Sequence, residues 1–237
     1  IFKSSRENYG SPRIYNALKN LGFVTSVETV ARYMRDLNLV SKTVKKFRVS
    51  TTNSNHNHRV SSNLLKQEFE GYNPGEVILG DITYIPTSEG WLYLSAVLDL
   101  GSREIAGWHM SATLESSSTV KALEMAATRT KITPETIFHS DRGVQYASNE
   151  FRQVLNYYGI KQSMSGRGNC YDNSPMESFF HTLKVELVHH ENFQTRKEAE
   201  LKIFEWIEVY YNRERLHSSI GYKNPFEYKC NYFQNHS

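Results

Sequence analysis

The sequence is poor in residues that cross-link a chain or anchor it in a membrane. Only two of its 237 residues are cysteines, Cys170 and Cys230, so it has no disulfide framework and cannot build a zinc site from cysteine alone. The longest candidate for an apolar run, residues 91–98, is strand-sized and too short to cross a bilayer. No signal peptide is visible. These absences argue against a secreted disulfide scaffold and a membrane protein, and they fit a reducing compartment.

Several kinds of catalytic and binding motif are also absent. No Ser-His-Asp or Cys-His set stands out, and Gly166-Arg167-Gly168 is too short for a phosphate-binding loop. His139, His189 and His190 lack the spacing of metal ligands, so we interpret them as surface or core residues. Because the chain starts at Ile1 and not at Met, we expect a fragment or a processed product.

Charge is unevenly distributed along the chain. The formal net charge is +3, but residues 1–71 carry 12 Lys and Arg against 5 Asp and Glu, a local charge of +7. The rest of the chain is therefore at −4. This pattern fits a polyanion-binding arm joined to a mildly acidic body, or simply a solvated basic surface.

The first 41 residues carry two helical patterns separated by a short turn. Pro12 suits the start of the first helix and Gly22 its end. Thr25 and Glu28 have capping-box spacing, which predicts the start of the second. The second apolar face comprises Val27, Val30, Ala31, Met34 and Leu37. The pair has the form of a helix-turn-helix, although any αα-hairpin gives the same pattern.

Composition then suggests the domain boundaries. We predict a DNA-binding segment over residues 1–41 and a linker over 42–73, because its basic and polar run, with His56 and His58, has nothing to bury. A catalytic core over 74–190 and a carboxy-terminal helix and tail over 191–237 follow. The candidate DNA contacts in the amino-terminal part are Arg32, Arg35, Lys42, Lys45, Lys46 and Arg48.

The element order after Pro74 indicates the fold class. Three closely spaced strand patterns read as an antiparallel meander, and a helix and two further strand–helix units follow. The order β-β-β-α-β-α-β-α predicts an α/β domain with a mixed five-stranded sheet flanked by helices, the order of the ribonuclease H-like fold. The strands are expected at 77–85, 91–98, 103–110, 136–139 and 160–164, and the helices at 116–130, 149–158, 174–190 and 195–211.

Asp81 interrupts an apolar strand, where a charged residue is rare unless it is paired or bound to metal. The structural alternative is a strand-end acid paired with a cation. Gly80 favours a functional role, because glycine in a strand often marks a bulge or a close approach. Asp99 is a rival acid on the next strand, but it starts a turn, where Asp is common.

Asp141 and Glu177 have structural alternatives too. Asp141 lies just past a buried strand, where α/β sheets place functional groups, yet it could belong to an ordinary turn. Glu177 has capping-box spacing from Ser174 and could merely cap its helix. Lys184 lies two turns after Glu177 on the same helix face and could bind a DNA phosphate or simply face solvent.

Three carboxylates brought together would form an oxygen-rich site for divalent metal. Two metals held in this way activate a nucleophile and stabilise the leaving oxygen in phosphoryl transfer.

The segments that hold these acids resemble a known family. Residues 138–146 (FHSDRGVQY) and 168–180 (GNCYDNSPMESFF) are similar to the integrase-like DDE transposases of bacterial insertion sequences, specifically the second-frame protein of the insertion-sequence-three family. Asp141 and Glu177 are separated by 35 residues, the spacing of the acidic triad of that family. Asp81 in Gly-Asp-Ile-Thr-Tyr matches the first acid, and Lys184 the basic residue after the Glu. The stretches 9–14 and 211–225 resemble the terminal motifs of the family.

The resemblance implies a DNA transposase with Mg²⁺ or Mn²⁺, two ions, as cofactor. Asp81 and Asp141 would share the metals and Glu177 would complete the site, while Lys184 would contact DNA. Water would cut the element ends, and each freed 3′-OH would attack target DNA. The family implies a homodimer or higher assembly on DNA, without a membrane, in the bacterial cytoplasm at the nucleoid. Two alternatives stay open, a metal-dependent nuclease of the same fold and a DNA-binding regulator derived from a transposase.

Overall fold

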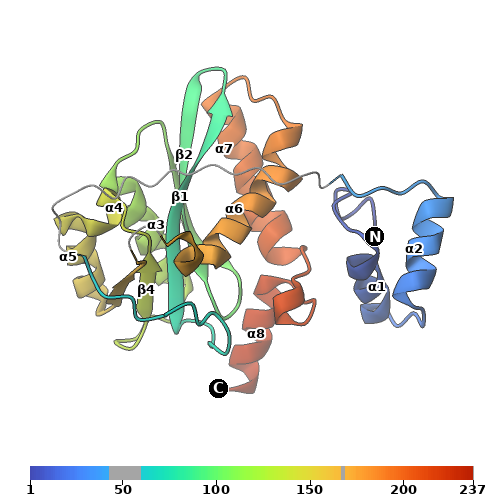
Figure 1. Cartoon of the computed structure of the whole chain (residues 1–237), viewed down its shortest axis with the longest axis horizontal. Coiled ribbons are helices and arrows are strands. Elements are labelled where there is room, and N and C mark those ends of the chain that lie inside the picture. The colour runs from blue at the N-terminus through green and yellow to red at the C-terminus, as the bar shows by residue number, and fades with distance from the viewer. Residues whose placement is uncertain (43–59, 167–168, 237) are drawn as a thin grey trace.

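The computed structural model describes residues 1–42, 60–166 and 169–236, and its central feature is a mixed sheet. The strand order is β3-β2-β1-β4-β5 (Figure 1). β1, β2 and β3 are antiparallel neighbours, whereas β4 and β5 run parallel to β1. This arrangement confirms the predicted fold class. The strands are β1 (Val77–Thr87), β2 (Gly90–Asp99), β3 (Ile105–Ser111), β4 (Ile137–Ser140) and β5 (Lys161–Met164).

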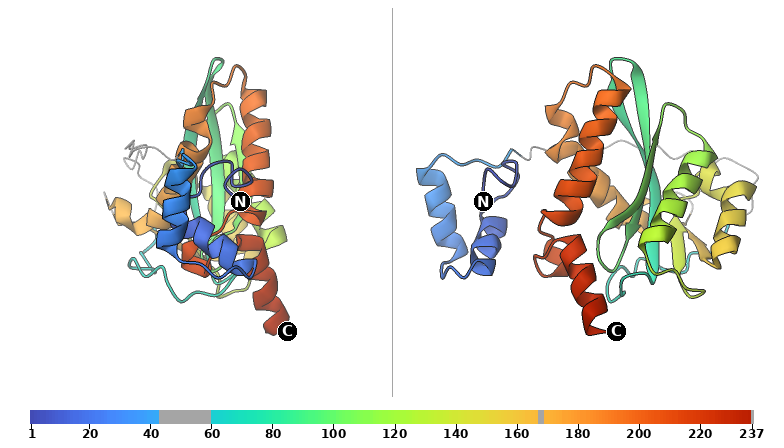
Figure 2. Two further views of the ribbon diagram at one scale, coloured as in Figure 1. Left: turned by 90° about the vertical axis from the view of Figure 1, so that its right-hand side faces the viewer. Right: turned by 180° about the vertical axis from the view of Figure 1, so that it is seen from behind.

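Helices cover both faces of the sheet, because alternate residues of the central strands are apolar on both sides. Ile78 and Val97 pack with α3 (Ser116–Arg129) and α5 (Asn149–Tyr158) on one face. Leu79 and Leu98 pack on the other face against the helical layer of α6 (Ser174–Glu186), α7 (Arg196–Glu205) and the π-helical turn η3 (Trp206–Tyr211). Figure 2 shows the two helical layers on either side of the strands. The short α4 (Val144–Ala147) follows β4, and α8 (Pro225–Asn235) ends the chain.

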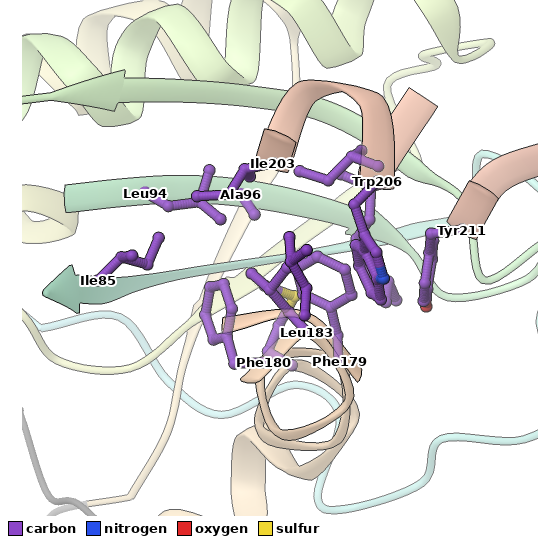
Figure 3. Packing of buried hydrophobic residues seen from close by; sticks show 14 of the residues in the cluster. Ile85, Leu94, Ala96, Phe179, Phe180, Leu183, Ile203, Trp206 and Tyr211 are labelled. Atoms are coloured by element: carbon purple, nitrogen blue, oxygen red, sulfur yellow. The ribbon is translucent and has the colours of Figure 1, made fainter. Parts of the chain in front are cut away.

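The larger core lies between the sheet and the layer of α6, α7 and η3 (Figure 3). Trp206 is fully buried and packs against Phe179 and Tyr211, with ring centroids 6.1 and 5.3 Å away. Burying each large apolar side chain contributes about 1.5–3 kcal/mol. This core therefore fixes α6, with Glu177 in its first turn, against β1.

Side-chain caps agree with the sequence prediction at one helix and differ at two. Thr195 caps α7 by accepting a hydrogen bond from the Glu198 N–H (3.1 Å), as the capping box predicted. The second helix, α2 (Val27–Asp36), is instead capped by Ser26, which accepts from the Thr29 N–H (3.2 Å), so the Thr25 cap was wrong. Ser174 is itself helical in α6, whose N-cap position is Asn173 and forms no side-chain cap. Glu177 therefore does not work as a capping-box partner of Ser174.

The amino-terminal helices form a small hairpin with its own core. α1 (Ser11–Asn20) and α2 pack around Tyr9, Ile14, Val30 and Met34, which are buried. The predicted inward residue Leu37 is instead 65% exposed. The Tyr9 hydroxyl accepts a hydrogen bond from the Leu216 N–H (2.7 Å), which fastens the hairpin to the carboxy-terminal segment.

Part of the predicted linker and of the predicted tail pack into the larger core. Leu65 is 1% exposed within it, and Phe69 packs against it. α7 and η3, from the predicted tail, supply Ile203, Trp206 and Tyr210 to the same cluster. No helix among the residues that the structure describes is long and apolar enough to cross a membrane.

Candidate active site

Strand pairing places Asp81 and Asp141 side by side. The parallel pairing of β1 with β4 ends at Gly80 opposite Ser140; Asp81 is the next residue of β1, and Asp141 is the first residue after β4. Neighbouring strands lie about 4.8 Å apart, so the two acids leave the sheet as neighbours. A Cβ on Gly80 would lie 2.3 Å from Cζ of Phe138, so this position needs glycine. The expected close approach at Gly80 is confirmed.

Local hydrogen bonds orient both aspartates. Oδ1 of Asp81 accepts a hydrogen bond from the Ile82 N–H (2.8 Å). Oδ1 of Asp141 accepts one from the Gly143 N–H (2.8 Å), so Asp141 does form the turn that its sequence context allowed. An ionised carboxylate offers about four lone-pair positions, so one such bond does not fill either aspartate.

Glu177 comes to the same place from the first turn of α6. The Asn173 side-chain amide, just before α6, donates to the Gly80 carbonyl (3.3 Å), which ties the start of the helix to the strand beside Asp81. Glu177 is exposed, and its negative charge contributes to the rise in the pKa of Asp81. The fold therefore brings all three predicted acids into one neighbourhood.

Negative charges lie close together at the site and shift the pKa of neighbouring groups. The pKa of Asp81 is raised well above its usual value, first by burial and then by the charges of Asp141 and Glu177, while Lys184 partly opposes the rise. The pKa of the buried Tyr146 is also raised, by burial and then by Asp81 and Asp141. A site with excess negative charge favours a cation.

The donors fit a hard divalent cation. Carboxylate and amide oxygens are the ligands that Mg²⁺ and Mn²⁺ prefer. Among the described residues, buried Oδ1 of Asn173 lacks a hydrogen-bond partner, so it is one more oxygen available beside Asp81. In the same described ranges, no three His, Cys, Asp or Glu side chains are grouped closely enough to count as a ready-made metal site.

Comparison with known proteins agrees with this geometry. Two families, each described as integrase core domain, match residues 71–170 and 158–225, and an HTH-like domain family matches residues 1–47. The InsF transposase of insertion sequence IS3A from Escherichia coli is 41% identical over 96% of this chain and 79% of its own length. The chain belongs to the IS3 family of transposases. It is therefore a DNA transposase, a polynucleotidyl transferase of the Asp-Asp-Glu class.

One further relative and one solved structure are similar to the chain. A 31 kDa protein of insertion element IS600 from Shigella sonnei, itself uncharacterised, is 43% identical over 97% of this chain and 84% of its own length. A cryo-EM structure of a simian T-cell lymphotropic virus intasome in complex with PP2A regulatory subunit B56 gamma aligns with a TM-score of 0.55. It covers 90% of this chain and 70% of that chain at 16% identity, so this likeness shows the fold alone.

The positive charge of Lys184 acts on Asp81 and opposes the rise in its pKa. Lys184 is half-buried, and its Nζ lies 5.1 Å from the ring centroid of Tyr84. Burial lowers the pKa of Lys184, and the charge of Asp81 opposes that change. Its position beside the transposase acids fits a contact with the DNA backbone.

The other predicted DNA contacts lie away from the acids. Arg32 and Arg35 are exposed on α2, in the hairpin and apart from the sheet (Figures 1 and 2). Lys42 is half-buried, and its backbone N–H donates to the Glu7 carbonyl (3.1 Å). The remaining three, Lys45, Lys46 and Arg48, fall outside the described residues, as do His56 and His58.

One other acid and one histidine have structural roles. Asp99 is fully buried and accepts hydrogen bonds from the N–H groups of Gly75 (2.7 Å) and Ser102 (2.8 Å), which confirms its turn role. His139 is a core residue bonded to Ser163 (2.8 Å), and burial lowers its pKa to about 4.

Sequence analysis missed Asp172, which organises the loop before α6. Its carboxylate accepts hydrogen bonds from the Gly166 N–H (2.6 Å) and from the side chains of Asn63 (3.0 Å), Gln67 (2.8 Å) and Asn169 (2.8 Å). The sequence around Asp172 shows only an Asp in a loop rich in Gly and Asn, which indicates a turn and not a hydrogen-bonding centre. Its partners Asn63 and Gln67 are 109 and 105 residues away, and no local pattern reveals them.

Proposed function

We propose that Asp81, Asp141 and Glu177 are the catalytic residues with which this transposase cuts DNA at the element ends and joins them to target DNA. The observation that carries the proposal is the end of β1–β4 pairing at Gly80 and Ser140, which sets Asp81 beside Asp141 in the field of Glu177. Asp99 is excluded from the set because its carboxylate already serves a turn.

The same three residues would hold two Mg²⁺ or Mn²⁺ ions, Asp81 and Asp141 sharing them and Glu177 completing the site. Such ions, when bound, lower the pKa of the attacking hydroxyl and neutralise charge on the leaving oxygen. The side chains of the protein set the position of this chemistry. Asp81 and Asp141 are fixed by the sheet, and Glu177 by the packing of α6.

Two phosphoryl transfers then follow. In the first, a water oxygen forms a bond to phosphorus at the element end, the P–O3′ bond breaks, and a 3′-OH is released. In the second, that 3′-OH oxygen bonds to a phosphorus of the target strand, and the target 3′ oxygen leaves as a hydroxyl. No covalent bond to the protein is formed. Lys184 would hold a backbone phosphate beside the acids.

The amino-terminal hairpin and its basic extension supply DNA binding in this proposal. Exposed Arg32 and Arg35 of α2, together with Lys42, Lys45, Lys46 and Arg48, would contact phosphates of the element end. The functional division would be residues 1–41 for DNA binding and 74–190 as catalytic core. Leu65 and Phe69 of the 42–73 linker, and α7 and η3 of the closing segment 191–237, would support that core by packing against it. Because two element ends react, the active form would be a homodimer or higher assembly on DNA, at the bacterial nucleoid.

The test uses Asp141→Asn and a labelled, pre-cut DNA end with plasmid target. We expect joining to fall by about a thousandfold or more, while the gel shift of the same DNA changes little. Normal joining by this variant would overturn the triad. A wild-type chain that cuts but never joins would instead be a nuclease of the same fold, and one that only binds would be a regulator.

A further inference from the structure

An aromatic pair lies on the outer half of the β1–β2 hairpin, close to the acids. Trp91 is 48% exposed, and its ring centroid is 4.7 Å from that of Tyr84 in an edge-to-face arrangement. The antiparallel register pairs Tyr84 with Tyr93 and Pro86 with Trp91, so Tyr84 and Trp91 lie on the same face of the hairpin. Ile85, on the other face, is buried in the larger core.

The aromatic pair lies on the face of the sheet that α3 and α5 cover, at the outer end of the hairpin beyond these helices. In Figure 1 the β1–β2 hairpin extends beyond α3, α4 and α5, while α7 lies beside it. α3 and α5 cover the inner half of that face through Ile78 and Val97. The aromatic pair is therefore on the part of the sheet that these helices leave uncovered.

Hydrogen bonds with Phe193 and with Arg196, the first residue of α7, hold the tip of the hairpin in place. The Ser88 N–H donates to the Phe193 carbonyl (2.9 Å), and the Arg196 N–H donates to the Glu89 carboxylate (2.8 Å). Nε of Arg196 donates to the Trp91 carbonyl (3.0 Å). The ring of Trp91 thus projects from a tethered backbone, so a ligand that stacks on it finds a surface already ordered.

Cations lie at both ends of the aromatic pair. Nζ of Lys184 is 5.1 Å from the Tyr84 ring centroid and lies in the field of Asp81. Arg196 holds the Trp91 carbonyl at the other end. A ring face for a base and cations for the flanking phosphates are the two components of a single-strand binding surface.

We propose that Tyr84 and Trp91 form a stacking surface for an unpaired base of the DNA strand whose phosphodiester lies at the acids. Tyr84 is three residues from Asp81 and the level of Trp91 is five, which is about 10 and 17 Å along a strand. At 3.4 Å per stacked nucleotide, that is within the first few nucleotides of the scissile bond. Because side chains alternate, Tyr84 and Asp81 point to opposite faces of β1, but β4 pairs with this edge of β1 only as far as Gly80. Lys184 lies over the Tyr84 ring and interacts with the charge of Asp81, so the aromatic pair and the acid meet at this edge. The inference rests on the proposed function, because it needs a DNA strand at Asp81.

The base has to be unpaired for the surface to work. Inside a duplex both faces of each base are covered by its neighbours, so an aromatic ring can stack only on a base that has left the helix or ends it. The transposase would therefore prefer a frayed DNA end, and it would tolerate different sequences because every base has a ring face.

The test compares binding of two DNAs by fluorescence anisotropy in buffer without divalent metal. One is a blunt duplex, and the other is the same duplex with three unpaired nucleotides at its end. We expect wild-type protein to bind the unpaired end more tightly. Trp91→Ala should lose about five- to hundredfold of that preference, and Trp91→Phe should keep most of it. Equal preference in wild type and Trp91→Ala would overturn the proposal.

A matched control is Tyr157→Ala, which removes an aromatic ring that is 82% exposed on α5 and far along the chain from the hairpin. This variant should bind both DNAs like wild type. Because the binding assay contains no metal, it does not depend on catalysis. Loss of joining in Asp141→Asn with retained end preference supports both proposals, whereas normal joining in that variant contradicts the triad and leaves the stacking result to stand separately.

Discussion

The two ends of α6 carry glutamates in opposite environments. Glu177 at its start is exposed in a neighbourhood of like charges. Glu186 at its end has a side chain only 2% exposed, and Arg215 donates to both of its carboxylate oxygens at 2.8–3.1 Å. Arg13 of α1 lies 3.7 Å away. A carboxylate bonded to a buried guanidinium is part of the structure, whereas carboxylates that raise the pKa of a neighbouring one mark a place for a cation.

Changing both glutamates to glutamine separates a catalytic carboxylate from a structural one. Glu177→Gln should reduce joining of a pre-cut end by about a thousandfold or more, since the amide loses the charge that would hold the metal. Its melting temperature should stay near the wild-type value, because the side chain is exposed. Joining and thermal unfolding measured on one preparation decide this. Unchanged joining would remove Glu177 from the catalytic set.

Glu186→Gln should lose stability and keep joining activity, the reverse of Glu177→Gln. Losing the charge of Glu186 leaves the buried Arg215 without its anion, which costs about 3–5 kcal/mol of unfolding free energy. For a chain of this size that corresponds to a drop of roughly 6–20 °C in melting temperature. The folded fraction should still join DNA below the transition. The paired change Glu186→Leu with Arg215→Met should restore most of the stability, and a failure to do so would contradict a simple charge pair.

The smallest expected effect is a pH dependence of the acidic cluster. Without divalent metal, the raised pKa of Asp81 means that folded protein holds this proton more tightly than unfolded protein, whose Asp pKa is about 3.9. Stability from this group is present at low pH and is lost as pH rises through the folded pKa. Asp141→Asn removes one like charge and should therefore be the more stable protein at pH 8, by on the order of 1 kcal/mol.

The titration of His139 changes stability with pH in the opposite direction to that of Asp81. The experiment must therefore compare two proteins at each pH. The His139 pKa of about 4 lies below the usual 6.5, and its stability contribution is lost as pH falls through that interval. Because both proteins contain His139, subtracting the melting temperature of Asp141→Asn from that of wild type at each pH cancels this term. A difference that stays constant from pH 5 to 8 in chelator would show that Asp141 does not influence Asp81.

Much of the fold was predictable because it depends on local patterns. The closely spaced apolar runs of β1 and β2 gave the meander, and the Thr195–Glu198 spacing gave the start of α7. Gly80 correctly indicated a close approach, although the ring that approaches, Phe138, lies 58 residues on. The family motifs identified Asp141 and Glu177, and strand register then placed Asp81 beside Asp141.

What was missed depends on contacts between distant segments or on choices between adjacent residues. Asp172 draws its donors from Asn63 and Gln67, more than a hundred residues earlier. Ser26 and Thr25 are both preferred cap residues, and the predicted Glu28 spacing favoured Thr25, whereas the backbone of the helix start selects Ser26. Leu37 fits the apolar face of α2 by spacing but lies just past the end of the helix, where that face no longer contacts α1.

The close approach of Phe138 to Gly80 couples the residue types that these two positions can hold. Phe138 is wedged between Phe151 and Tyr146, with ring centroids 5.0 and 5.9 Å away, so it has little freedom to move aside. Any side chain acquired at position 80 demands a smaller residue at position 138, and a smaller residue at 138 opens a void unless position 80 grows. Sequence drift at these two sites should therefore be correlated, and single-step changes at either should be selected against.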